Sequence, residues 1–303
     1  MDGEAGPRRP IRFAGRAYRA GVRRYTPRLF SLAQRLGLHV VANSFESPIP
    51  DTRQLDVAYQ RGSDLVGIDM REEEQVALAR ELSRFRKELE SLPAAPTSDP
   101  HQFYFENPRF NGVDACVLWC FVRHYQPARI VEVGSGHSTR FFARAIADGG
   151  LTTRLTAIDP APRAQLSGLA VEWLRDAVPG VGMAPFAALA AGDFLFIDSS
   201  HVLMPGSDVD FLINRLLPSL PPGVLVHLHD IFLPDDYPAE WDWRGYNEQL
   251  AVAALVVGGD WQVRFASHYV ATRLADAVAA SAVAALPLGA GARESSLWIE
   301  RQR

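Results

Sequence analysis

The stretch from Ala128 to Arg140 places an acid, two glycines and several hydroxyl side chains directly after an apolar run. Gly134 and Gly136 remove side chains where the backbone could approach a ligand closely. The helix expected to follow presents free N–H groups at its start, and such a helix start binds polar groups of nucleotides. The pattern therefore predicts a nucleotide-type pocket built from a strand, a glycine loop and a helix.

Two details of this stretch narrow the choice of ligand. A dinucleotide-binding loop carries a third glycine three residues after the second, and Thr139 stands at that position. Glu132, near the end of the expected strand, would repel a pyrophosphate but suits a cationic or hydroxyl-bearing ligand. A nicotinamide oxidoreductase is therefore disfavoured.

Acids and histidines also follow three later apolar runs, at Asp159, Asp198 and the pair His229-Asp230. Ligands of open α/β sheets bind beyond the carboxyl ends of the strands, so these residues are site candidates. A carboxylate accepts paired hydrogen bonds well, and we expect Asp159 to bind the ribose hydroxyls of a nucleoside. The alternative role for Asp159 is that of a helix N-cap.

The motif Glu132-x-Gly134-x-Gly136-x-Ser138 resembles the first motif of class I S-adenosylmethionine-dependent methyltransferases, with Ser138 in place of the usual third glycine. The resemblance continues through residues 155–159, 193–198 and 224–230, and so covers roughly residues 105–303. It implies S-adenosylmethionine as the cofactor. The residues implied to bind it are Glu132, Gly134, Ser135, Gly136, Ser138, Thr139, Asp159 and Asp198.

The loop Asp198-Ser-Ser-His201 is similar to a loop of catechol-type O-methyltransferases that carries a metal-binding aspartate and, three residues later, a general base. This implies catalytic roles for His201 as the base and for Asp198 and His229 beside it. Asp198, His229 and Asp230 would be the ligands of a divalent metal ion, Mg²⁺ or Mn²⁺. Catechol-type enzymes carry an aspartate-asparagine pair where this chain has His-Asp, so the metal is not favoured. A loop histidine bonded to backbone is the alternative for His201.

Aromatic residues alternate with acids after Asp230, and Tyr237, Trp241 and Tyr246 are the expected substrate wall or cation–π surface for the sulfonium. The alternative is an aromatic loop that caps the edge of the sheet. Phe45 lies in an apolar, proline-containing segment that we expect to act as a lid, or as a strap packed on the surface.

Composition argues against two classes of partner, whereas the small-molecule acceptor is what the resemblance implies. The chain has 303 residues, 48% of them hydrophobic, and a net charge of −4, so neither nucleic-acid nor membrane binding is expected. Its two cysteines, Cys116 and Cys120, are expected to be buried thiols in a reducing cytoplasm. No apolar stretch is long enough to span a bilayer.

Three regions are expected along the chain. Residues 1–28 hold eight arginines and two acids and form a basic tail. Residues 29–100 form a helical appendage, in which 71–93 is an amphipathic helix that packs on the main domain, with a homodimer contact as the alternative. Residues 101–303 form the catalytic α/β domain, a doubly wound, Rossmann-like sheet. The resemblance implies seven strands with the last one antiparallel; we expect strands at 129–133, 154–159, 180–184, 193–198, 223–229, 262–267 and 295–300.

The leading functional hypothesis is methyl transfer from S-adenosylmethionine to a small molecule, at oxygen, in a bacterial secondary-metabolite pathway. A second hypothesis keeps the cofactor but lets its amine attack its own side chain, which gives azetidine-2-carboxylate and methylthioadenosine. A third is a non-catalytic module that binds S-adenosylmethionine.

Overall fold

A computed structural model describes residues 27–41, 43, 47–52, 67–99, 102–107, 109–284 and 292–303. The chain divides into two compact units, residues 1–60 and residues 61–303. In the first unit, residues 27–35 are helical. Phe45 lies outside the described residues, as does most of the expected basic tail, and the lid remains a prediction.

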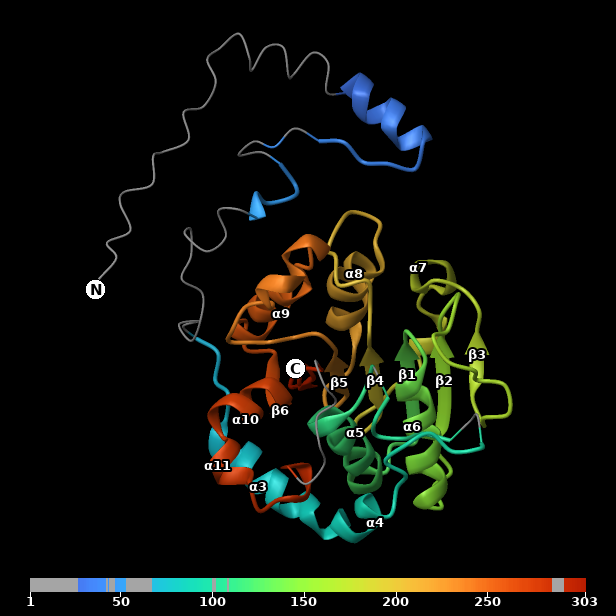
Figure 1. The fold of residues 1–303 in the computed structure, drawn as a ribbon, viewed down its shortest axis with the longest axis vertical. Coiled ribbons are helices and arrows are strands. Elements are labelled where there is room, and N and C mark those ends of the chain that lie inside the picture. Colours follow the sequence, from blue (N-terminus) through green and yellow to red (C-terminus); the bar gives the residue numbers. More distant parts are fainter. Residues whose placement is uncertain are drawn as a thin grey trace, which may run out of the picture. The chain divides into compact units, whose positions relative to one another are not determined.

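The second unit is built on a seven-stranded sheet with the order β3-β2-β1-β4-β5-β7-β6 (Figure 1). All neighbouring strands are parallel except β7, which runs antiparallel to both β5 and β6. The strands are β1 (Arg129–Val133), β2 (Arg154–Ile158), β3 (Glu172–Leu174), β4 (Phe194–Ile197), β5 (Leu225–Leu228), β6 (Trp261–Ala266) and β7 (Leu297–Arg301). The doubly wound sheet with an antiparallel last strand is therefore confirmed.

The prediction of a strand at residues 180–184 is wrong. Residues Val178–Val181 form the short helix α7, and the third strand is instead Glu172–Leu174. Pro179 cannot donate a ladder hydrogen bond, so this apolar run is unsuited to a strand. The true strand lies at the edge of the sheet, pairs with β2 alone and is only partly buried. It therefore lacks the continuous apolar pattern of β1 and β4.

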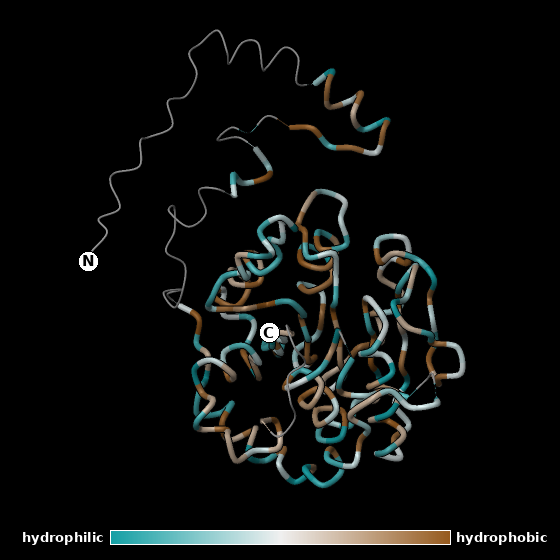
Figure 2. Tube along the Cα trace, in the orientation of Figure 1, coloured by the Kyte–Doolittle hydropathy of each residue, from teal (hydrophilic) through white to brown (hydrophobic). Residues whose placement is uncertain are grey.

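Helices cover both faces of the sheet because successive side chains of each strand point to opposite sides. Phe194 and Phe196 of β4 belong to one core cluster, whereas Leu195 and Ile197 belong to another. Helices α5 (Gly112–Tyr125) and α6 (His137–Asp148) contribute to the first cluster. Helices α8 (Asp208–Phe211) and α9 (Glu248–Val257) and the π-helical turn η4 (Leu212–Leu216) contribute to the second. Figure 2 shows hydrophobic stretches along the inner strands and hydrophilic ones on the outer turns.

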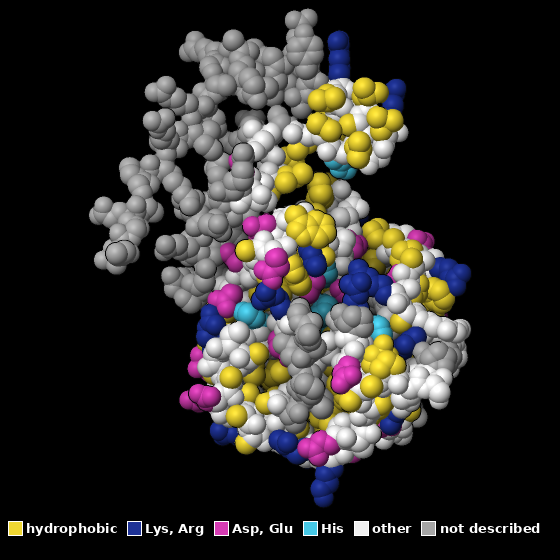
Figure 3. Space-filling view, in the orientation of Figure 1, with side chains coloured by type: hydrophobic (Ala, Val, Ile, Leu, Met, Phe, Trp, Pro, Cys, Tyr) yellow, Lys and Arg dark blue, Asp and Glu magenta, His cyan; other side chains and the backbone are white. Residues whose placement is uncertain are grey.

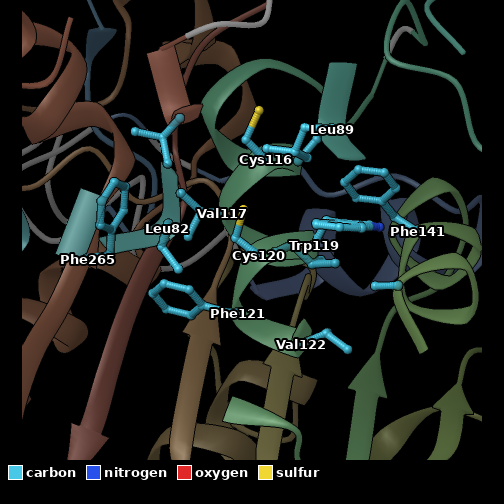
Figure 4. Close-up of a cluster of buried hydrophobic side chains, with 14 of the residues drawn as sticks. Leu82, Leu89, Cys116, Val117, Trp119, Cys120, Phe121, Val122, Phe141 and Phe265 are labelled. Atoms are coloured by element: carbon cyan, nitrogen blue, oxygen red, sulfur yellow. The ribbon is translucent and has the colours of Figure 1, made fainter. Parts of the chain in front are cut away.

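The helix expected over 71–93 packs on the main domain, as predicted. It forms α3 (Glu72–Leu82), a 3-10 turn at Ser83–Phe85 and α4 (Arg86–Glu90). Leu82 and Leu89 of this segment lie against Trp119 and Phe121 of α5 in one buried cluster (Figure 4). Helices α3 and α4 therefore share the core of the sheet domain. The division at residues 28 and 100 itself remains a prediction.

Cys116 and Cys120 are free thiols buried on α5, as expected. Burial raises the pKa of both thiols well above the ordinary value, so both are protonated, inert core residues. The remaining helices are α10 (Ser267–Arg273) and α11 (Ala275–Val278). None of the helices that the structure describes is long and apolar enough to cross a membrane.

Candidate active site

The glycine loop between β1 and α6 requires glycine at its first position. Gly134 has a φ of +77°, and a Cβ atom built there would lie 2.2 Å from the carbonyl oxygen of Asp198. No side chain fits that space, because the loop after β1 and the loop after β4 touch at this point. Gly134 thus lets the two strand ends meet at the carboxyl edge of the sheet.

Glu132 stands behind this loop as a fully buried acid. Ser138 Oγ donates a hydrogen bond to its Oε1 at 2.5 Å, whereas Oε2 has no partner among the described residues. Burial outweighs the hydrogen bonds from Ser138 and Thr139 and raises the pKa of Glu132 to about 8. A cation placed beside Oε2 would favour the charged carboxylate, so this acid suits a positively charged ligand.

The other residues expected to bind the cofactor hold the loop in shape. Asp159 Oδ2 accepts hydrogen bonds from the backbone N–H of Ser135 at 2.7 Å and from Ser135 Oγ at 3.0 Å. Asp159 Oδ1 accepts from the backbone N–H of Ala161 at 2.7 Å. Thr139 Oγ1 accepts from the backbone N–H of Gly136 at 2.9 Å. Asp159 thus lies at the loop, where its remaining lone pairs can accept further hydrogen bonds.

His201 is enclosed by three carboxylates. Its Nε2 lies 3.2 Å from Asp198 Oδ1 and 3.5 Å from Asp230 Oδ2, and its Nδ1 lies 3.0 Å from Glu248 Oε2. Both ring nitrogens therefore face acceptors, which is the hydrogen-bonding pattern of an imidazolium. Burial opposes its charge, but the hydrogen bonds with Asp198 and Glu248 outweigh this effect and hold the pKa of His201 well above its ordinary value.

The backbone conformation around His201 and Asp230 holds this cluster in place. His201 and Asp230 have positive φ angles of 60° and 55°, a backbone conformation that is uncommon for residues other than glycine. The backbone N–H groups of Asn247 and Glu248, at the start of α9, both donate to the carbonyl oxygen of His201. The start of α9 therefore fixes the loop after β4 and places the Glu248 carboxylate beside His201 Nδ1.

The carboxylates of this cluster do not fit a divalent metal. Asp198 and Asp230 converge on His201 Nε2, so the imidazole occupies the position where a shared cation would lie. Within the described ranges, no group of three His, Cys, Asp or Glu side chains is arranged as a metal site. The expected ligand set of Asp198, His229 and Asp230 is thus brought to one place, but its charges are already matched by His201.

His229 differs from His201 in its hydrogen bonding. Its ring lies 5.5 Å from the Phe110 ring and lines the cavity, and its Nδ1 has no partner in the described part of the chain. His227, two residues earlier, is fully buried and stacks on Phe196 at 3.8 Å, as a core residue does. Of the three strand-end histidines, His229 alone lines the cavity without a carboxylate bound to its ring among the described residues, and its unpartnered Nδ1 is itself buried.

The cavity at the strand ends has a volume of about 490 Å³. Trp241 and Tyr246 line this cavity, whereas Tyr237 packs behind Tyr246 with ring centroids 5.8 Å apart, and the role of these residues in binding substrate remains a prediction. Tyr237 is largely buried, and its hydroxyl accepts a hydrogen bond from the Gln249 backbone N–H. The lining residues are Arg109, Asn111, Asp114, Arg163, Asp198, His201, His229, Asp230, Trp241, Trp243, Arg244, Tyr246, Ala292, Arg293 and Ser295.

The sequence patterns missed the functional residues that lie outside the strand-end motifs, namely one glutamate and four arginines. Glu248 binds His201 across a separation of 47 residues. Four arginines line the cavity: Arg244 lies in the aromatic segment but was not singled out from the sequence, and the other three come from loops that carry no recognisable motif. An acid in the first turn of a helix beside an aromatic loop was the available signal for Glu248, but that position is common at helix starts for other reasons.

The strand order and the glycine loop define a class I methyltransferase fold, and the family comparison agrees. Residues 131–231 match the family model Methyltransf_24, which is described as a methyltransferase domain. The match covers only this part of the chain, which therefore carries a methyltransferase domain, and the matched family implies S-adenosylmethionine as the methyl donor.

A protein of Archaeoglobus fulgidus is 28% identical over 116 residues, which are 36% of this chain and 52% of that protein. The chain thus spans about half the length of this curated relative. The O-methyltransferase TomG from Streptomyces achromogenes, involved in tomaymycin synthesis, is 17% identical with a TM-score of 0.41, over 81% of this chain and 93% of that chain. The plantazolicin methyltransferase BpumL, bound to S-adenosylhomocysteine, is 12% identical with a TM-score of 0.43, over 77% of this chain and 98% of that chain.

Proposed function

We propose that this chain transfers the methyl group of S-adenosylmethionine to a hydroxyl group of a small-molecule acceptor. The observation that carries the proposal is the cavity of about 490 Å³ at the carboxyl ends of the strands. Asp198 and Arg163 connect this cavity to the glycine loop, and His229 lines it. A methyl donor and an acceptor can therefore meet beside an imidazole. The bacterial secondary-metabolite pathway remains a prediction.

The residues around the glycine loop fit the cofactor. The unpartnered Oε2 of Glu132 is a free acceptor for the methionine part, and a positive charge placed beside it would favour the ionised carboxylate. Asp159 lies at the end of β2, where the ribose hydroxyls would bind. When bound, the cofactor supplies a methyl group on a positively charged sulfur. The protein aligns donor and acceptor and excludes water between them.

We assign the proton transfer to His229. His201 was the base expected from sequence, but both of its nitrogens face carboxylates and neither offers a free lone pair. His229 would take the hydroxyl proton while the acceptor oxygen bonds to the methyl carbon and the carbon–sulfur bond breaks, which leaves S-adenosylhomocysteine. His201 would then be a positioning residue that holds Asp198 and Asp230 in place.

The adenosyl product tests this function. The purified protein is incubated with S-adenosylmethionine alone and with a panel of hydroxylated aromatic acceptors. The proposal expects S-adenosylhomocysteine only when an acceptor is present. Methylthioadenosine without an acceptor would instead identify cyclisation of the cofactor, and tight cofactor binding with no product in any arm would identify a binding module.

A histidine variant and a packing control test the assignment of the base. His229→Gln should slow a single turnover about 10²–10⁴-fold while binding of S-adenosylhomocysteine stays nearly unchanged. Phe110→Leu, which alters a ring packed near His229, serves as the packing control and should have a much smaller effect. Native turnover in His229→Gln would show that His229 is not the general base, and a neighbouring residue would then have to take the proton.

A further inference from the structure

Four arginines line the cavity together with Asp114, Asp198 and Asp230, and Arg163 lies close enough to Asp198 to interact with its charge. Arg293 pairs with Glu240. The guanidinium groups of Arg109, Arg163 and Arg244 make no hydrogen bond or ion pair with the residues that the structure describes. Basic side chains gather across the middle of this face, beside acids and histidines (Figure 3). A concave surface with unpaired positive charge attracts an anion.

Arg244 is the best positioned of these groups. Its guanidinium carbon lies 4.0 Å from the centre of the Trp241 ring and 5.4 Å from that of Tyr246. Cation–π contacts of this kind hold the plane of the guanidinium group without using its N–H donors. The donors of Arg244 thus remain available to a carboxylate or phosphate, which they match in geometry.

Among the described residues, no ion pair joins Arg244 to an acid, including Asp242 on the same turn. Glu240, on the same 3-10 turn η6 (Ala239–Arg244), bonds to Arg293, and the acids at the base of the cavity face His201. The fold therefore supplies the aromatic support for Arg244 but no carboxylate among the described residues. A missing counter-ion at the wall of a substrate cavity points to a ligand that brings its own negative charge.

Arg244 also lies on the acceptor side of the cavity. Tyr246, which contacts Arg244, has its ring centroid 4.7 Å from that of His201. Arg163 lies instead against the glycine loop, because its backbone N–H donates to the carbonyl oxygen of Ser135 at 3.2 Å. Arg163 is thus placed to meet the cofactor, and Arg244 is placed to meet the second substrate.

We propose that the methyl acceptor is an anion, with a carboxylate, phosphate or sulfate group that binds Arg244 in the frame of Trp241 and Tyr246. The proposal rests on the function proposed above, because it names the substrate class of the same cavity. Arg109, exposed on the rim, adds a second positive charge to this subsite.

The test uses the full chain saturated with S-adenosylhomocysteine and titrated with benzoate, inorganic phosphate or benzamide, with heat of binding as the readout. Benzamide is the neutral match for benzoate. We expect benzoate or phosphate to bind and benzamide to bind at least about 10-fold more weakly. Which of the two anions binds better distinguishes a carboxylate acceptor from a phosphate ester.

Variants of Arg244 test whether this residue binds the anion. Arg244→Gln should weaken anion binding about 10- to 100-fold, the loss of one charge-assisted bidentate contact. Arg244→Lys should recover only part of it, because an ammonium group lacks the planar stacking. Arg154→Gln, at the start of β2 on the opposite edge of the sheet, is the matched control and should leave binding unchanged.

Equal binding of benzoate and benzamide would overturn the proposal, as would no detectable anion binding or unchanged affinity in Arg244→Gln. Binding of S-adenosylhomocysteine, measured first in the same sample, separates the two levels of the account. If the adenosyl ligand fails to bind, the proposed function fails. If it binds and the anion arms fail, only the anionic acceptor is refuted.

Discussion

Replacement of His201 by glutamine should cost the protein much of its stability. The change removes the positive charge that faces Asp198, Asp230 and Glu248 at 3.2, 3.5 and 3.0 Å. The side chain of Glu248 is 1% exposed and that of His201 is 5% exposed, so water cannot compensate the loss. Removing one partner of a buried ion pair costs about 3–5 kcal/mol. We expect a loss of this size in the free energy of unfolding of His201→Gln.

Urea unfolding of four proteins at pH 7 measures this effect: wild type, His201→Gln, Glu248→Gln and the double variant. If Glu248 is the main stranded charge, the cost of His201→Gln should fall to about 1–2 kcal/mol in the Glu248→Gln background, because the glutamine is neutral. The double-mutant cycle thus isolates the contact between His201 Nδ1 and Glu248 Oε2.

A second histidine provides the matched control. His268 Nε2 lies 2.8 Å from Asp235 Oδ2, at a site where both side chains are partly exposed and Asp235 keeps a second partner, Arg273. His268→Gln should therefore cost no more than about 1 kcal/mol. If His201→Gln were no more costly than His268→Gln, and the cycle showed no coupling with Glu248, the description of His201 as the buried cation of the site would be refuted.

Four further outcomes are expected. In urea unfolding, Gly134→Ala should lower the free energy of unfolding by more than about 2 kcal/mol, because of the clash with the Asp198 carbonyl and the positive φ. Gly136→Ala should lower it less, because the added Cβ would meet its nearest atom at 3.5 Å. An equal loss in the two variants would contradict the described packing at Gly134. Asp159→Ala should weaken binding of S-adenosylhomocysteine by ~1–3 kcal/mol in calorimetry, and unchanged affinity would remove Asp159 from the ribose site. The pKa of Glu132 in the folded protein is raised to about 8, so its contribution to stability is present below the ordinary pKa of 4.5 and is lost as the pH rises through about 8. Between pH 5 and pH 9, wild type should therefore lose more free energy of unfolding than Glu132→Gln does. Parallel curves of stability against pH for the two proteins would refute the raised pKa. Turnover should be unchanged in excess chelator, whereas loss of activity restored by Mg²⁺ would reinstate a metal.

The sequence was informative where structure is local. Gly134 and Glu132 follow an apolar run within a few residues, so the strand, the loop and the start of α6 could be predicted together. The same holds for Asp198 and Asp230, since parallel strands bring their carboxyl ends to one edge. The amphipathic pattern of residues 71–93 also correctly predicted helical structure that packs on the domain.

The sequence was uninformative where contacts join distant segments. Glu248 reaches His201 because α9 begins beneath the loop after β4, and no pattern in either segment encodes that meeting. Arg244 is placed by stacking on Trp241, a tertiary arrangement that sequence spacing alone does not reveal. The error at 180–184 has a local cause, because a short apolar run with a proline does not distinguish a strand from a helical turn.

The fate of the methyl group tests the central claim most directly. The protein is incubated with S-adenosylmethionine carrying a deuterated methyl group and with a small-molecule extract of its native host, and the products are followed by mass spectrometry. Our account predicts that the deuterated methyl appears on the oxygen of an anionic acceptor, together with an equal amount of S-adenosylhomocysteine, and that His229→Gln slows both. A deuterated methyl found only in methylthioadenosine, or left on unreacted cofactor, would contradict it.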